Sequence, residues 1–167
     1  QVEQAQRSNN SNIKQLKPYI LSVGALKKRK GYDYSIQAFA EVAGKFPNLK
    51  YVIVGDGPER ENLELRIMKH ELKDRVIFLD NLPEEKLISL YKNAELFILL
   101  PQDIDKDIEG FGLAFLEAAA AGLPVVATKE TSAEDAVLDG QNGILVPPRD
   151  WKVAAEAISK ILLDPEL

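Results

Sequence analysis

Residues 109–128 have the sequence EGFGLAFLEAAAAGLPVVAT, in which Glu117 is the only polar side chain between positions 111 and 127. An apolar pattern on nearly every face predicts a helix that is buried on most sides. Gly122 marks where this helix should end. The β-branched pair Val125 and Val126 then begins a strand. The stretch therefore predicts a helix followed directly by a buried strand, a unit from which α/β folds are built.

The same alternation extends along the chain from about residue 18. Short apolar runs predict strands covered on both faces, because they are continuous rather than alternating. Amphipathic segments between them predict helices, and this order predicts an α/β fold: a Rossmann-like, doubly wound, parallel six-stranded sheet with helices on both faces. The predicted strands are residues 19–23, 50–54, 75–79, 96–100, 124–127 and 143–146, and the predicted helices are residues 32–45, 58–72, 84–93, 112–121, 133–138 and 151–163.

Composition narrows the classes of protein to which the chain can belong. Its 167 residues are 46% hydrophobic and 28% charged, which suits one globular domain. Residues 1–17 are polar and without apolar periodicity, so they predict a linker or disordered start before a domain at 18–167. The net charge of −5 argues against a nucleic-acid partner. No apolar run reaches the roughly 18 residues of a membrane span, and we expect a cytoplasmic protein.

Candidate ligand-binding residues lie where loops leave the predicted strands, because ligands of such sheets bind outside the carboxyl ends. Gly110 and Gly112 allow the backbone to approach a ligand, and the N–H groups of a helix start favour an anion such as phosphate. Glu117 has two interpretations: it accepts hydrogen bonds from ligand hydroxyls, or it lies on a solvated edge of the helix. Glu109 likewise either serves a ligand or only complements the helix dipole.

These residues resemble the signature of a known family, the retaining glycosyltransferases of the GT-B fold, called group 1 or family 4. That signature has two glutamates with seven residues between them around a Gly-Phe-Gly turn, and residues 109–117 match it. Further matches lie at residues 23–31, 54–58, 90–97 and 139–146. The resemblance covers about residues 18–165 and implies the C-terminal half of such an enzyme, which binds the nucleotide-sugar donor.

The resemblance implies a role for each matched residue. Glu109 would be catalytic, contacting the donor sugar and supporting the charge that develops at its anomeric carbon. Lys30 would neutralise the diphosphate leaving group, and Glu117 would bind the ribose hydroxyls. Backbone amides at the start of the helix would contact the sugar and phosphates, without a metal or other cofactor. The implied donor-binding residues are Lys30, Gly110, Phe111, Gly112, Leu113 and Glu117.

The resemblance also implies partners. The substrate would be a nucleotide-diphosphate sugar, and the acceptor would be held by the enzyme's own amino-terminal domain, to which nothing in this sequence corresponds. The domain alone is therefore expected to bind the donor and to transfer no sugar. Membrane contact, at the cytoplasmic face, is expected only through the missing half.

Two departures from the family pattern keep alternatives open. Ala25 stands where an arginine usually follows the first-loop glycine, and Thr131 and Ser132 stand where two glycines are usual. A sugar-nucleotide epimerase-like relative and a non-catalytic nucleotide-binding module are the alternative interpretations. The residues predict neither the base nor the sugar of the donor, nor the acceptor or the linkage.

Two other kinds of site are disfavoured. Hydrolase carboxylates stand about 5–9.5 Å apart, whereas eight residues of helical rise would separate Glu109 and Glu117 by ~12 Å. The acidic run at residues 103–109 resembles a calcium loop, but it has Ile108 where such a loop needs glycine. We therefore expect a flexible loop beside the donor site and no metal.

Overall fold

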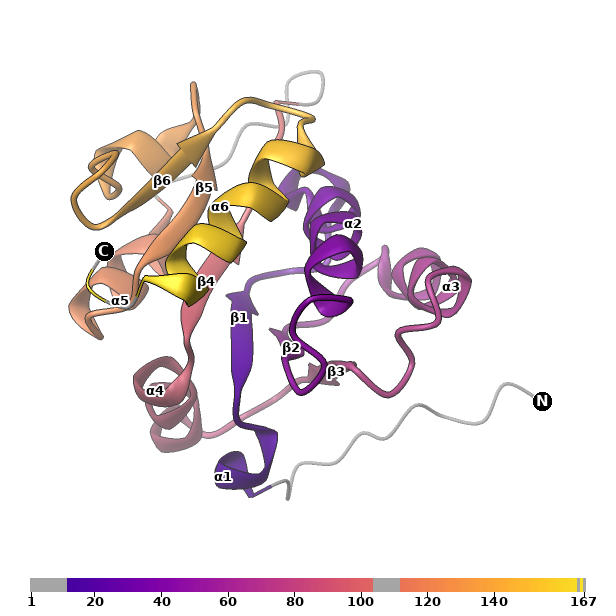
Figure 1. The fold of residues 1–167 in the computed structure, drawn as a ribbon. Coiled ribbons are helices and arrows are strands. Elements are labelled where there is room, and N and C mark those ends of the chain that lie inside the picture. Colours follow the sequence, from indigo (N-terminus) through magenta and orange to yellow (C-terminus); the bar gives the residue numbers. More distant parts are fainter. Residues whose placement is uncertain (1–11, 104–111, 165, 167) are drawn as a thin grey trace.

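The structure is a computed structural model that describes residues 12–103, 112–164 and 166 (Figure 1). Its strands form one sheet in the order β3-β2-β1-β4-β5-β6, and every pairing is parallel. The predicted doubly wound fold is confirmed. The strands are β1 (Tyr19–Val23), β2 (Lys50–Val54), β3 (Val76–Leu79), β4 (Leu96–Leu99), β5 (Val125–Thr128) and β6 (Gly143–Val146).

Helices cover both faces of the sheet. The hydroxyl of Tyr19, on β1, donates a hydrogen bond to the carbonyl of Leu90. The hydroxyl of Ser22, also on β1, is hydrogen-bonded to that of Tyr51, which in turn donates to the hydroxyl of Ser35. Positions 19 and 22 point to opposite faces of a strand, so the helices that carry Leu90 and Ser35 lie on opposite faces. The helices are α1 (Ile13–Leu16), α2 (Tyr32–Ala43), α3 (Arg60–Lys69), α4 (Glu84–Asn93), α5 (Leu113–Ala120) and α6 (Trp151–Leu163).

Contacts between helices complete the two layers seen in Figure 1. On one face α2 packs against both α3 and α6, and on the other α4 packs against α1. Every residue of β4 is buried, which explains why its sequence is a continuous apolar run. At the sheet edge, β6 is only partly buried. In the described parts of the chain, no helix is long and apolar enough to cross a bilayer.

Two segments differ from the sequence-based prediction. The helix predicted at 133–138 is a single 3₁₀ turn, η2 (Ser132–Asp135), because Thr131 caps its start and the chain turns away again at Ala136. Helix α1 lies inside the segment predicted to be a linker, and Leu16 at its end is buried. Residues 1–11 lie outside the described residues.

Candidate functional site

The sheet reverses its direction of winding between β1 and β4, which pair directly. At this switch point the two exit loops touch. The amide of Gln102 donates to the carbonyl of Arg29 at 2.7 Å. Gly31 has a left-handed φ of 68°, and a Cβ there would overlap the carbonyl oxygen of Leu100. Crevices at such switch points are where doubly wound sheets bind ligands.

The loop after β1 carries Lys30, the last residue of the short turn η1 (Lys28–Lys30). Its Nζ lies 3.8 Å from the position that a Cβ on Gly24 would occupy. Tyr32, two residues later, donates from its hydroxyl to the Gly24 carbonyl at 2.9 Å. The predicted phosphate-binding lysine therefore lies over the carboxyl end of β1, on a loop that a side-chain hydrogen bond holds in place.

The Gly-Asp-Gly turn after β2 supports the same loop. A Cβ on Gly55 would overlap the Gly24 carbonyl, and one on Gly57 would come within 2.7 Å of the Leu26 carbonyl oxygen. The Leu26 amide donates to the carbonyl of Asp56 at 3.0 Å. These glycines let the exits of β1 and β2 pack backbone against backbone, which is sufficient reason for their place in the sequence.

Helix α5 begins at Gly112, whose φ of 62° is left-handed. A Cβ there would lie 2.9 Å from Cδ2 of Phe115 and 3.5 Å from the hydroxyl oxygen of Ser132. The following residue, Leu113, has 66% of its side chain exposed. Because a helix start leaves its first N–H groups without intrahelical acceptors, this end of α5 can bind an anionic group.

The loop after β5 carries Thr131 and Ser132, and the Ser132 hydroxyl lies near this helix start. Thr131 donates to the carbonyl of Thr128 at 2.8 Å and accepts from the amide of Ala133. The hydroxyls of Thr128 and Ser132 are buried and have no hydrogen-bond partner among the described residues. Side chains thus replace the two glycines that the family pattern has at 131 and 132.

Glu117 lies on the second turn of α5 with its side chain exposed. The hydroxyl of Tyr91, on α4, donates to its Oε2 at 2.7 Å. Burial, reinforced by this hydrogen bond and the charge of Glu117, raises the pKa of Tyr91 above its ordinary value. The phenol therefore stays protonated as the donor at neutral pH. Sequence patterns alone do not reveal this partner, because 26 residues separate the two side chains.

Residues 3–167 match the protein family described as Glycosyl transferases group 1. The chain belongs to this family. A GDP-mannose-dependent alpha-(1-6)-phosphatidylinositol monomannoside mannosyltransferase from Mycolicibacterium smegmatis is 32% identical to it over 151 residues. That match covers 89% of this chain and 40% of the mannosyltransferase, so the chain spans about two fifths of this curated relative.

Solved structures agree with membership in the group 1 family. The C-terminal domain of a group 1 glycosyl transferase (LpcC) from Francisella tularensis matches with a TM-score of 0.78 at 24% identity, covering 94% of this chain and 85% of that domain. HepE from Anabaena, in complex with UDP and glucose, matches with a TM-score of 0.76 at 27% identity, covering 89% of this chain and 39% of that one. The fold is therefore that of a GT-B C-terminal domain.

In this group 1 domain the predicted site residues fall into two sets. The structure places Lys30 at the exit of β1, and Gly112, Leu113 and Glu117 along the first two turns of α5. Glu109, Gly110 and Phe111 lie outside the described residues, as does most of the acidic run from 103 to 109, and the roles predicted for them stay predictions.

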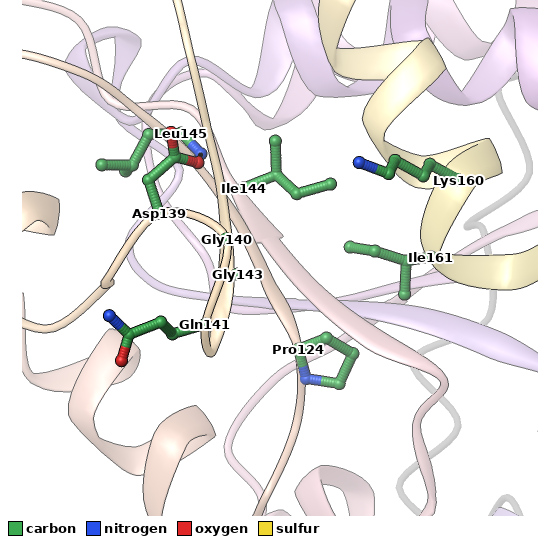
Figure 2. A pocket seen from close by; sticks show the side chains of 9 residues that line it. All are labelled: Pro124, Asp139, Gly140, Gln141, Gly143, Ile144, Leu145, Lys160 and Ile161. Carbon is green, nitrogen blue, oxygen red and sulfur yellow. Dashed lines mark hydrogen bonds between the residues drawn. The ribbon is translucent and has the colours of Figure 1, made fainter. Parts of the chain in front are cut away.

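A hollow of about 320 Å³ lies elsewhere on this group 1 domain, between β6 and the end of α6 (Figure 2). Pro124, which precedes β5, lines it, so it is at the amino ends of the strands and away from the switch point. Figure 2 shows Ile144 and Ile161 facing each other across it. Beside it, Oδ1 of Asp139 accepts from the amide of Leu145 at 2.9 Å, on the outer edge of β6.

Proposed function

We propose that this domain binds the donor of a retaining glycosyltransferase that moves a sugar from a nucleotide-diphosphate sugar to an acceptor. The observation that carries the proposal is the arrangement of α5, which starts at a left-handed glycine and presents the exposed carboxylate of Glu117 one turn further on. Lys30 supplies a cation at the neighbouring exit of β1. The helix start and Lys30 bind the diphosphate, and Glu117 binds the ribose hydroxyls.

The chemistry needs little beyond position and charge. The bond from the anomeric carbon to the diphosphate oxygen breaks, a bond to the acceptor oxygen forms with retained configuration, and the acceptor's hydroxyl proton passes to the departing diphosphate or to solvent. Negative charge gathers on the departing diphosphate, where Lys30 and the amino end of α5 stabilise it. Glu109 supports the positive charge at the anomeric carbon. The proposal uses no metal or cofactor.

The acceptor belongs to the other half of the proposed enzyme. An amino-terminal domain of the full-length protein would face the carboxyl ends of the strands, hold the acceptor and complete the cleft. The mannosyltransferase relative takes its donor from GDP-mannose, and HepE was solved with UDP and glucose. Relatives thus differ in base and sugar, and we propose a nucleotide-diphosphate sugar without choosing among them. The isolated domain binds this donor and transfers nothing.

Calorimetric titration of the 167-residue chain with UDP, GDP, ADP and their sugar conjugates tests the proposal. We expect one nucleotide to bind. Glu117→Gln should weaken its binding about ten- to hundredfold, as loss of a hydrogen bond to a charged group does. The matched control is Glu61→Gln, which changes an exposed glutamate on α3 and should leave the affinity unchanged. Absence of binding by every nucleotide, or equal affinity of the Glu117 variant, would refute the proposal.

One observation favours a second candidate, a nucleotide-binding module that does not catalyse transfer. Ala25 is exposed in the loop after β1, where the family usually has an arginine. Mixing the full-length protein with the sugar nucleotide that the domain binds separates the two candidates. A new glycosidic product supports the transferase, and binding without product or donor consumption supports the module.

A further inference from the structure

Tyr91 and Glu117 form a pair in which one side chain is buried and the other is exposed. The ring of Tyr91 is 4% exposed, whereas Glu117 is open to solvent. The Tyr91 hydroxyl donates to one carboxylate oxygen only, Oε2. An ionised carboxylate has about four acceptor positions on its two oxygens, and the described residues use one of them, so the others can accept from a ligand.

The position of the Tyr91 hydroxyl is fixed by the core. Its ring stacks on Phe97 of β4, with centroids 5.9 Å apart and an interplanar angle of 23°. Phe97 in turn meets the edge of Phe115 at 5.9 Å, and Phe115 lies on α5 two residues before Glu117. Three packed rings thus connect the hydroxyl to the helix that carries the carboxylate.

An exposed glutamate on a helix normally samples several rotamers, and ordering it at a binding site opposes association. A hydrogen bond from a buried, fixed donor removes much of that cost before the ligand arrives. Side chains on a helix also lean toward its amino end, so the Glu117 side chain is directed toward the start of α5 rather than toward its end.

We propose that Tyr91 is a positioning residue, which holds Glu117 in the orientation that accepts hydrogen bonds from the vicinal ribose hydroxyls of the donor nucleotide. This inference rests on the proposed function. It assigns to α4 a part in recognising the ribose, although Tyr91 itself touches no ligand.

The test compares the nucleoside diphosphate that binds the wild-type chain with its 2′,3′-dideoxy counterpart, by calorimetry. Tyr91→Phe keeps the ring and removes the hydroxyl. We expect its affinity for the ribonucleotide to fall about three- to tenfold, the effect of one side chain that is no longer pre-ordered. Affinity for the dideoxy nucleotide should not change. The ratio of the affinity for the ribonucleotide to that for the dideoxy nucleotide should therefore shrink.

Tyr19→Phe is the matched control, because Tyr19 is also buried and donates to α4, at the carbonyl of Leu90. Tyr19→Phe should lower the melting temperature without changing the ratio of the affinities for the ribonucleotide and the dideoxy nucleotide. In a Glu117→Gln background, Tyr91→Phe should have no further effect on the ratio. Circular dichroism checks that each variant is folded, which we expect of Tyr91→Phe because it keeps the buried ring and its stacking on Phe97.

Two outcomes would overturn the inference, and they are distinct. If the wild type prefers the ribonucleotide and Tyr91→Phe prefers it equally, the positioning role is wrong and the proposed function stands. If the wild type binds no nucleotide, or binds the dideoxy form equally well, no ribose is recognised at Glu117 and both proposals fail.

Discussion

At Gly31 the loop after β1 packs against the backbone of Leu100, just beyond β4. The left-handed φ of 68° at Gly31 costs any other residue about 1–2 kcal/mol, and a Cβ there would also displace the backbone of Leu100. We expect Gly31→Ala to lower the free energy of unfolding by about 3 kcal/mol or more, measured by urea denaturation. Movement of the adjacent Lys30 should weaken nucleotide binding as well.

Gly122 provides the comparison for that substitution. Its φ is 74°, but no atom lies within 4 Å of a Cβ placed there. Gly122→Ala should therefore cost only the backbone conformation, about 1–2 kcal/mol, and leave nucleotide affinity unchanged. Equal destabilisation by the two substitutions would contradict the close approach of Gly31 to Leu100.

The positions of Lys30 in a strand-exit loop and of Glu117 on a helix could be predicted from sequence, because each belongs to a short motif; their roles stay predictions. Their surroundings could not be predicted. The contact between Tyr91 and Glu117 depends on where α4 and α5 lie relative to each other in the fold, which local sequence patterns do not contain. The bond from Tyr32 to Gly24 is similar, since an aromatic residue at a helix start predicts only burial.

Among the elements, helix α6 has a side-chain cap at its start. Oδ1 of Asp150 accepts from the amide of Val153 at 3.1 Å and caps the helix, which packs against α2. Asp150→Ala should cost about 1 kcal/mol, equivalent to a fall of about 2–4 °C in the melting temperature of a domain of this size. Glu156→Ala, at an exposed position of the same helix, should change it little; a similar fall would argue against the cap.

Element boundaries were predicted well where a sequence signal marks them and poorly elsewhere. Gly122 marked the end of α5, and the structure has it just beyond Ala120 with a positive φ. Residues 133–138 had helical composition, yet they form only the 3₁₀ turn η2. The cap by Thr131 and the short connection to β6 determine that these residues form a 3₁₀ turn. Helix propensity alone predicts neither the cap nor the connection.

For the molecule as a whole, buried tyrosines set its response to alkaline pH. Burial raises the pKa of Tyr51 to about 12, and burial also raises those of Tyr19 and Tyr91. Unfolded tyrosine loses its proton near pH 10, so between about pH 10 and 12 the unfolded chain is deprotonated first. Stability is therefore fully present below about pH 10 and falls as the pH rises above it.

Urea denaturation at pH 9, 10 and 11 measures this fall. Tyr51→Phe removes one of the three groups and should show a shallower decline between pH 10 and 11, although its hydrogen bonds with Ser22 and Ser35 are lost at every pH. A slope identical to that of the wild type would show that Tyr51 does not contribute to the decline.

The sheet could be predicted as parallel and doubly wound because the alternation of strands and helices allows little else. Strand order is a different matter, since the crossover from β3 to β4 passes over β2 and β1 and no local signal reports it. The order β3-β2-β1-β4-β5-β6 is therefore known from the structure and not from the sequence.

The bond between Asp139 and the amide of Leu145 has a consequence for self-association. An edge strand with unused amides invites a strand from another molecule to extend the sheet. On β6 the carboxylate already occupies that amide, and Gly140 donates to the outer carbonyl of Gly143 at 2.9 Å. A strand from another molecule would have to displace both of these hydrogen bonds before it could pair with β6. This edge of the sheet therefore resists polymerisation by strand addition.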